Sequence, residues 1–140
     1  MIDDVLQGIG AALKDEFGSD IRVTAENTEQ GLSGPCFFVQ LIKPQDEPFP
    51  SHVTRWVQPF DVIYFPADGE GLQAMYTIAR RGIAALQIIE IGDRKTRGTQ
   101  FSYQVVDDVL HIFVNYDLFV RTESEKYPMK TIDTNVGVKP

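Results

Sequence analysis

The longest run of alternating apolar and polar residues lies between positions 99 and 121. Successive side chains of a β-strand point to opposite faces of a sheet, so a period of two indicates strands. The apolar positions on one face are Phe101, Tyr103, Val105, Leu110, Ile112, Val114, Tyr116, Leu118 and Val120. The alternation is interrupted at Asp107-Asp108, a residue type that is typical of turns. The segment therefore predicts a long antiparallel hairpin.

Two other segments place apolar residues at i, i+3 and i+4, which is the spacing of an amphipathic helix. The first helix is expected at residues 2–17, because its first turn is acidic, as the helix dipole favours, and a glycine follows it. The second is expected at 70–86, with Asp68 or Gly69 near its N-cap. Residues 87–91, QIIEI, either extend this helix or form a short strand.

Three further strands are expected before the second helix, at 21–25, 36–42 and 53–65. The run at 36–42 is mostly apolar on both faces, which indicates a central strand that is covered on both sides. The run at 53–65 contains Pro59, which cannot donate a hydrogen bond to a neighbouring strand. We therefore expect that strand to be interrupted at Pro59, by a bulge or at a sheet edge.

Four segments lack a regular apolar pattern. Residues 26–34 are polar and predict a loop. Residues 43–50 contain three prolines, which excludes regular structure, so this loop is expected to project or to pack on a neighbour. Residues 92–98, GDRKTRG, predict a basic loop. The C-terminal segment, 123–140, is interpreted either as a last strand within 129–138 or as an arm that orders only against a partner.

The expected order of elements is α-β-β-β-α-β-β, with a further strand or an arm at the C-terminus. Helices that lie between groups of antiparallel strands indicate the α+β class. We expect a mixed, mainly antiparallel β-sheet with two α-helices packed on one face. Residues 1–122 would form this single domain, since 140 residues are the length of one ordinary domain.

Composition narrows the class of function. The net charge of −7 argues against nonspecific DNA binding, which needs Lys and Arg facing the phosphates. No apolar run approaches the length of a membrane span, and the start of the chain is acidic where a signal peptide is basic, so we expect a cytoplasmic protein. Cys36 is the only cysteine, which excludes an internal disulfide and a metal site built from several cysteines.

No catalytic or cofactor-binding motif is complete. The G-E-G sequence at 69–71 lacks the rest of a dinucleotide-binding motif, so a turn followed by a helix is favoured. His111, Asn115 and Asp117 share one strand face and include ligand types, but isolated ligand types are common on surfaces. Cys36 begins an apolar strand, where a cysteine usually behaves as a small buried hydrophobe. We therefore expect no catalytic residue, no metal and no cofactor.

The notable side chains are better suited to contacts between proteins. A strand face that is partly apolar and partly polar fits a surface between subunits. The interface candidates are Phe49 and Trp56 in or near the proline-rich segment, Arg94, Lys95 and Arg97 in the basic loop, and His111, Phe113, Asn115 and Asp117 in the hairpin. Each set also has a plainer interpretation, because the aromatic residues can fold back onto the core and short charge runs are usually solvated.

Four pieces of the chain stand in a recognisable order. They are the amphipathic N-terminal helix, GPCFFVQL at 34–41, FDVIYFP at 60–66 and RGTQFSYQVVDDVLHIFVNYDLFV at 97–120. In this order they resemble the tail terminator, or tail completion, proteins of bacteriophages and prophages, and most closely the branch common in prophages of Gram-positive bacteria. The resemblance covers most of residues 1–121. It rests on pattern and order, because none of the pieces is a catalytic motif.

The resemblance implies a non-enzymatic structural protein, a small α+β domain that assembles into a ring, typically a hexamer. Such a ring caps the tail tube, stops its polymerisation and joins the tube to the head connector, while DNA passes through the lumen without specific binding. The implied partners are other copies of the chain, the tail tube protein and the connector, with no membrane. The implied location is the host cytoplasm during assembly and then the virion tail.

Two other functions are compatible with the sequence. A related neck or adaptor protein would have the same fold at another position in the tail. A small-molecule-binding domain or an enzyme would need a pocket with convergent polar groups, and no such constellation can be identified in the sequence.

Overall fold

The computed structural model describes residues 2–25 and 35–121. The elements are α1 (Ile2–Phe17), β1 (Arg22–Thr24), β2 (Cys36–Leu41), β3 (Gln45–Phe49), β4 (Val53–Phe65), α2 (Leu72–Leu86), β5 (Ile88–Ile91), β6 (Arg94–Val106) and β7 (Val109–Arg121). The expected loop at 26–34 and the expected C-terminal strand or arm at 123–140 lie outside the described residues.

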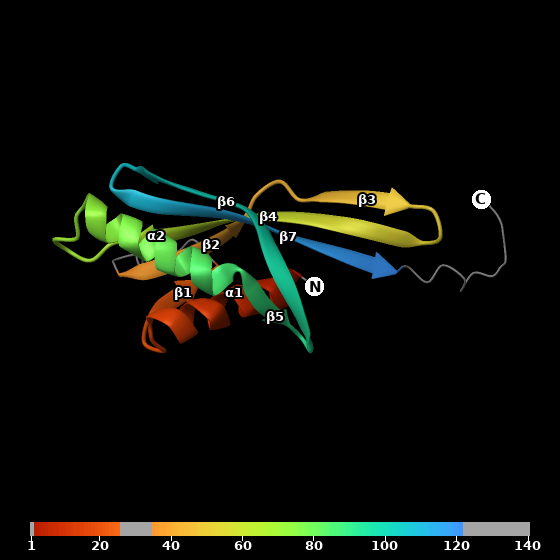
Figure 1. The fold of residues 1–140 in the computed structure, drawn as a ribbon, viewed down its shortest axis with the longest axis horizontal. Helices are drawn as coiled ribbons and strands as arrows, with labels where there is room; N and C mark the ends of the chain where they lie inside the picture. The colour runs from red at the N-terminus through yellow and green to blue at the C-terminus, as the bar shows by residue number, and fades with distance from the viewer. Residues whose placement is uncertain (1, 26–34, 122–140) are drawn as a thin grey trace.

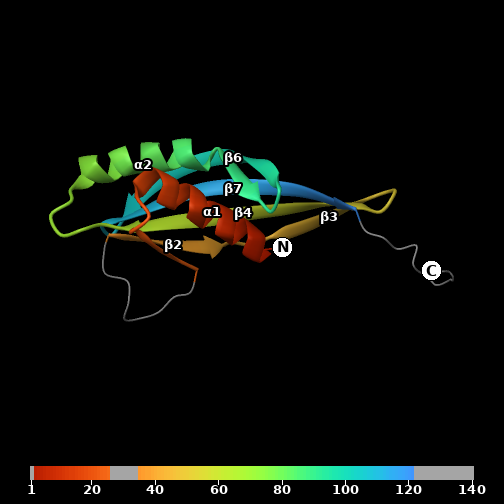
Figure 2. The ribbon, with the colours of Figure 1, turned by 90° about the horizontal axis from the view of Figure 1, so that it is seen from below.

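The strands form one sheet in the order β1-β2-β4-β7-β6-β5, and β3 pairs with β4 on the same side as β2, beyond the end of β2 (Figure 1). Among the described strands, β1 and β2 are the one parallel pair. Both helices contribute to one core on the same side of the sheet (Figure 2). The α+β class, the mainly antiparallel sheet and the two helices on one face are therefore confirmed. The sheet has one strand that was not expected, β3, and β5 settles the open interpretation of 87–91 in favour of a strand.

The helices bury the apolar stripes that predicted them. In α1, Val5, Ile9 and Leu13 are fully buried, one turn apart. The second helix begins at Leu72, two residues later than expected, and its N-cap is Gly71, close to Asp68 and Gly69, without a side-chain cap. The preceding turn is held instead by the Glu70 carboxylate, which accepts hydrogen bonds from the Tyr64 hydroxyl at 2.7 Å and the Ala67 N–H at 2.8 Å.

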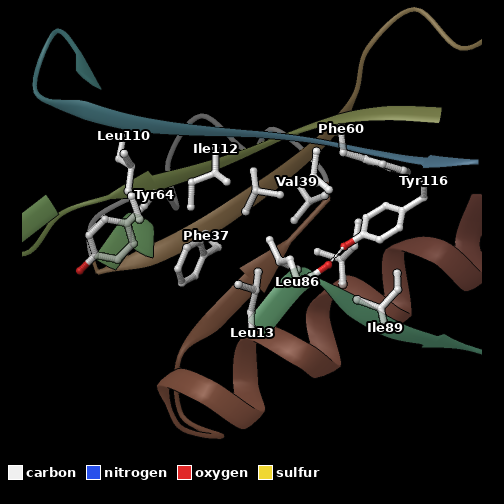
Figure 3. Close-up of a cluster of buried hydrophobic side chains, with 14 of the residues drawn as sticks. Leu13, Phe37, Val39, Phe60, Tyr64, Leu86, Ile89, Leu110, Ile112 and Tyr116 are labelled. Atoms are coloured by element: carbon white, nitrogen blue, oxygen red, sulfur yellow. Dashed lines mark hydrogen bonds between the residues drawn. The ribbon is translucent and has the colours of Figure 1, made fainter. Parts of the chain in front are cut away.

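The core lies between the helices and strands β2, β4 and β7 (Figure 3). Its largest fully buried side chains are Tyr116, Phe37 and Phe60. Leu110, Ile112, Val114 and Tyr116 all point into it, as the alternation along β7 predicts. In β2 the residues Cys36, Phe37, Phe38 and Val39 are buried on both faces, although β2 is the second strand from an edge rather than a central one.

The expected hairpin is present as β6 and β7. Asp107 and Asp108 form the turn with φ of 54° and 63°, and positive φ at both central residues is characteristic of the type I′ hairpin turn. The register shifts between Thr99 and Ser102, where Gln100 has a φ of 58°, so β6 contains a bulge that the sequence pattern did not reveal.

Strand β4 is continuous, so the expected interruption at Pro59 was wrong. The Pro59 carbonyl accepts a 2.8 Å hydrogen bond from the Ile42 N–H. In an antiparallel ladder, the N and O atoms of a residue point to the same side, so the Pro59 nitrogen also faces that edge. There β2 has ended at Leu41 and β3 begins only at Gln45. The missing N–H therefore faces a gap between two strands and leaves no ladder bond unmade.

The proline-rich segment 43–50 is not irregular throughout, as was expected, because Gln45–Phe49 forms β3. Pro44 and Pro50 flank the strand. The backbone N–H and C=O groups of odd-numbered β4 residues point towards β3, as the Pro59 carbonyl shows. The β3 residues opposite them, such as Glu47, therefore make the backbone hydrogen bonds with β4. Pro48 therefore turns its nitrogen to the unpaired side of β3, where a proline is tolerated.

The segment 92–98 was expected to be a loop, and this was wrong as well. Its only turn residues are Gly92, with a φ of 63°, and Asp93. From Arg94 the chain is already in β6, and Arg94 to Arg97 pair with β5. A two-residue connection is sufficient for a hairpin, and Gly92 adopts the positive φ that such turns require.

Candidate assembly surface

The face of the sheet opposite the helices, here called the outer face, carries four of the predicted interface residues. His111, Phe113, Asn115 and Asp117 alternate with core residues along β7 and therefore share this face. Their partners across β4 are Ile63, Asp61, Pro59 and Val57, in the same order. No described helix covers this face (Figure 2). The structure thus confirms that the four residues share one side of a strand, while their role in an interface stays a prediction.

Arg55 of β4 is the centre of a polar network on the outer face. Its Nη1 donates a 2.8 Å hydrogen bond to the Glu47 carboxylate of β3, and its Nε donates a 3.0 Å bond to Asp117 of β7. Asn115 donates a further hydrogen bond from Nδ2 to Asp117. The bonds to Asp117 and Glu47 raise the pKa of the Arg55 guanidinium above its ordinary value. The network therefore joins three adjacent strands through one cation.

Asn115 is 5% exposed, and its Oδ1 has no hydrogen-bond partner among the described residues. A buried polar atom without a partner is unfavourable for folding. Its strand partner in β4 is Pro59, whose nitrogen faces the other edge of β4.

A second polar pair lies nearer to the hairpin turn. His111 Nδ1 is 2.9 Å from Asp61 Oδ2, and the ring of His111 stacks on Phe113 with an interplanar angle of 12°. Asp61 is 8% exposed. Burial raises the pKa of Asp61 above its ordinary value, because the charged carboxylate loses hydration, while the hydrogen bond with His111 acts in the opposite direction.

The far end of the sheet forms an arm, defined here as β3, residues 53–57 of β4 and residues 117–121 of β7. The arm extends beyond the layer of helices (Figure 1). On its outer face Phe49 and Phe119 lie with ring centroids 6.3 Å apart. They remain 46% and 59% exposed, so their mutual contact leaves most of both rings in solvent. Exposed aromatic side chains that lie together are typical of contact surfaces.

Trp56 lies on the other face of the arm. It is opposite Leu118 of β7 and Asp46 of β3, and it is half-buried. The structure therefore separates Trp56 from Phe49, although both were grouped in one region by sequence. Each of the two faces of the arm carries one of these aromatic residues.

The basic candidates Arg94, Lys95 and Arg97 lie at the start of β6, in the hairpin with β5. All three side chains are exposed. The hairpin turns away from the main sheet, because β6 pairs with β7 only from Gly98 onwards. The basic residues are therefore on a different surface from the outer-face candidates.

The sequence interpretation missed Arg55, Glu47, Asp61 and Phe119, which complete the outer-face contacts. A usable signal was present for two of them. Arg55 and Asp61 are the charged residues of the run VTRWVQPFDVIYF, and both have odd numbers, which places them on one strand face. A charged residue in a long, largely apolar strand needs a partner, and the partners are Asp117 and His111.

Other chemistry has little support among the described residues. In the ranges 2–25 and 35–121, no three His, Cys, Asp or Glu side chains are grouped so that they could hold a metal ion. Cys36 is 1% exposed. A cavity of about 430 Å³ between α1 and β5 is lined by Asp15, Glu16 and Glu90, and Glu16 is bonded to Arg81. No described helix is long and apolar enough to cross a membrane.

The fold and its surfaces define a small α+β domain that offers contact surfaces and, in its described part, no recognisable catalytic centre. The family described as phage tail terminator protein matches residues 4–128. The chain belongs to this family, which confirms the resemblance found in the sequence and makes the chain a structural component of a phage tail. No curated protein matches the chain. Its placement in the Gram-positive prophage branch stays a prediction.

Proposed function

We propose that the chain closes into a ring, a hexamer as the resemblance implies, which caps the tail tube and joins it to the head connector. The observation that carries this proposal is the arm. It extends beyond the helices and presents Phe49 and Phe119 to solvent. An aromatic patch on a projecting sheet is best explained as a surface that another subunit covers.

A closed ring requires two different surfaces on each subunit, because its contacts run head to tail. The chain offers two such surfaces. The arm carries the aromatic pair on its outer face and the exposed Asp46 on its other face, while the β5–β6 hairpin exposes Arg94, Lys95 and Arg97. Opposite charges on the two surfaces favour one orientation of neighbouring subunits.

The net charge supports the proposed passage of DNA. At −7, the subunit repels a polyanion, so DNA in the lumen would be held loosely and would remain mobile. The ring would assemble in the host cytoplasm and remain in the virion tail. Its partners would be other copies, the tail tube protein and the head connector.

The ring is tested by the Phe119→Ser variant. Loss of a central aromatic contact should weaken each subunit contact by about 2 kcal/mol, or roughly 30-fold. The free energy of unfolding should change by less than about 0.5 kcal/mol, because the side chain is exposed. Native mass spectrometry with and without the tail tube protein measures the assembly, and urea unfolding measures the fold.

Val106→Ser is the matched control. Val106 is 43% exposed and lies at the opposite end of the sheet, next to the hairpin turn. A ring that forms equally well in wild type and Phe119→Ser contradicts the proposed surface. A chain that stays monomeric with the tube protein and leaves tube length unchanged contradicts the ring itself.

Charge reversal at Asp117 is a poorer test, although the sequence suggests it. Asp117 is bonded to Arg55 and Asn115, so a lysine there would disturb the arm as well as any interface. The neck or adaptor alternative is separated by binding, since an adaptor would bind connector protein and leave tube length unchanged.

A further inference from the structure

Part of strand β7 has no neighbour on one side. β6 pairs with β7 as far as Gly98 opposite Tyr116. Beyond that point, residues 94–97 of β6 pair with β5 instead. Residues 117–121 of β7 are therefore paired with β4 on one side and with no described strand on the other. An unpaired strand edge is a ready site for another strand.

The ladder shows which backbone groups face this edge. The backbone N–H and C=O groups of even-numbered β4 residues point towards β7. Their even-numbered partners in β7 therefore make the hydrogen bonds between these two strands. The N–H and C=O groups of Asp117, Phe119 and Arg121 consequently point to the unpaired side. Those of Leu118 and Val120 are directed towards β4.

The opposite edge of the arm is blocked. On the unpaired side of β3, Pro48 presents a nitrogen without hydrogen, and the strand carries the exposed Asp46. Proline and charge are devices that keep edge strands from pairing. No proline lies in residues 117–121, and the acidic side chain in this stretch, Asp117, is bonded to Arg55. The two edges therefore differ, and only the β7 edge is competent to accept a strand.

A small groove adjoins the β7 edge. Its volume is about 140 Å³, and it is lined by Leu118, Phe119 and Val120 of β7 and by Asp4, Ile91, Arg94 and Thr96. The β5–β6 hairpin and the start of α1 bound its far side. The folded hairpin on the far side leaves little room for the edge of another folded sheet, so a single extended segment suits this position better.

We propose that the chain's own C-terminal segment, residues 129–138, pairs with this edge as an added antiparallel strand. The segment begins where the match to the family ends, at residue 128, and it lies outside the described residues. Its sequence, MKTIDTNVGV, alternates so that Ile132, Thr134, Val136 and Val138 share one strand face. Lys130 shares this face and is opposite in charge to Asp4, which lines the groove.

The connection favours a strand from the same chain over one from a neighbour. Residues 122–128 separate the end of β7 from the segment, and seven residues are enough to reverse direction. A short connection gives a high effective concentration, so the intramolecular pairing is favoured at ordinary protein concentrations. The pairing does not depend on ring formation, and it closes an edge that would otherwise be open to unspecific association.

Hydrogen exchange at single amides tests this pairing, because it produces an odd–even pattern. In the full chain, at concentrations where its mass is that of a monomer, the amides of Asp117, Phe119 and Arg121 should exchange slowly. A chain that ends at Pro128 should lose this protection by about 10-fold or more. The amides of Leu118 and Val120 should be unaffected, because they bond to β4. Removal of residues 139 and 140 alone is the matched control and should change nothing.

Three results would overturn the pairing. The odd-numbered amides could be unprotected in the full chain, or their protection could survive the truncation. Protection could also return when isotope-labelled truncated chain is mixed with unlabelled full chain, and the segment would then come from a neighbouring copy. Each result leaves the ring untouched, since native mass measures the ring independently.

Discussion

The hydroxyl of Tyr116 donates a 2.6 Å hydrogen bond to the backbone carbonyl of Leu86 (Figure 3). Tyr116 is fully buried in β7, and Leu86 is the last residue of α2. The carbonyl groups in the last turn of a helix have no partner within the helix. This bond therefore satisfies one of them and fixes the end of α2 over the centre of the sheet.

Tyr116→Phe should lower the free energy of unfolding by about 1–3 kcal/mol, because the buried Leu86 carbonyl loses its partner. Urea unfolding measures the loss. Tyr103→Phe is the control, since the Tyr103 ring packs on Tyr76 and its hydroxyl has no hydrogen bond among the described residues. An equal loss in both variants would contradict the importance of this bond.

The Tyr116 hydroxyl should also make the free energy of unfolding depend on pH in the alkaline range. Burial raises the pKa of Tyr116 in the folded chain above its ordinary value of 10.0. A raised folded pKa means that its contribution to stability is present below the unfolded pKa and declines as the pH rises above about 10. The stability difference between wild type and Tyr116→Phe should therefore shrink above that pH. A constant difference would argue against burial of the hydroxyl.

Substitution of Gly8 or Gly10 in α1 by alanine should change the free energy of unfolding in opposite directions. A Cβ at Gly8 would lie 2.4 Å from the Glu90 carbonyl oxygen, so Gly8→Ala must push α1 away from β5 and should cost about 1–3 kcal/mol. A Cβ at Gly10 would meet Val23 at an ordinary 3.7 Å, and Gly10→Ala should gain up to about 1 kcal/mol from helix propensity. Thermal or urea unfolding of both variants decides the matter, and similar effects would contradict the close approach.

One substitution in the β6–β7 hairpin turn should raise the stability of the chain. Asp107 and Asp108 both have positive φ, which costs an L-residue roughly 1–2 kcal/mol. Asp108→Gly removes this strain and should stabilise the chain by several tenths to about 1 kcal/mol, whereas Asp108→Val should destabilise it. The melting temperatures of the two variants should lie on opposite sides of the wild type. A destabilised glycine variant would show that the turn has another conformation.

Asp61 should make the fold sensitive to moderately acidic pH. Its pKa is raised from the ordinary value of 3.8, so its favourable contribution is present below that value and is lost as the pH rises through the folded pKa. The stability of wild type relative to Asp61→Asn should accordingly fall as the pH increases above 3.8. Unfolding measured across this range gives the slope. No slope would mean that the carboxylate is solvated, and a slope of opposite sign would mean that the interaction with His111 outweighs burial.

The comparison of wild type with Asp61→Asn can be repeated in a chain that also carries His111→Leu, which tests the contact between His111 and Asp61. The hydrogen bond and charge of His111 lower the pKa of Asp61, so their removal should raise that pKa further. The fall in relative stability should then continue to higher pH than with His111 present. If the profile is the same in both backgrounds, the pair does not form in solution.

Periodicity was sufficient for much of the fold. The hairpin and α1 follow from alternation and helical spacing, because both are amphipathic and lie on one core. The errors arose where local rules depended on a neighbour. Pro48 and Pro59 are compatible with strands only because their nitrogens face an open edge and a gap, and a single sequence does not reveal which side a nitrogen faces.

The residues of the candidate surface were likewise only partly predictable from the sequence. Alternation places His111 and Asp117 on one face, but their partners Asp61 and Arg55 come from β4, which is distant in sequence. Such pairs depend on the register between strands, and the register is fixed by the whole sheet. Trp56 was misgrouped with Phe49 for the same reason, because the reversal between β3 and β4 places them on opposite faces.

The gap opposite Pro59 also has a mechanical consequence. On one side β4 is held along nearly its whole length by β7, but on the other side it is held by two separate strands whose registers are independent. We therefore expect β3, which the Arg55–Glu47 ion pair ties to β4, to separate at a lower free-energy cost than β2 and the core. The arm would then be a compliant extension of the domain, able to adjust its curvature to a neighbouring molecule.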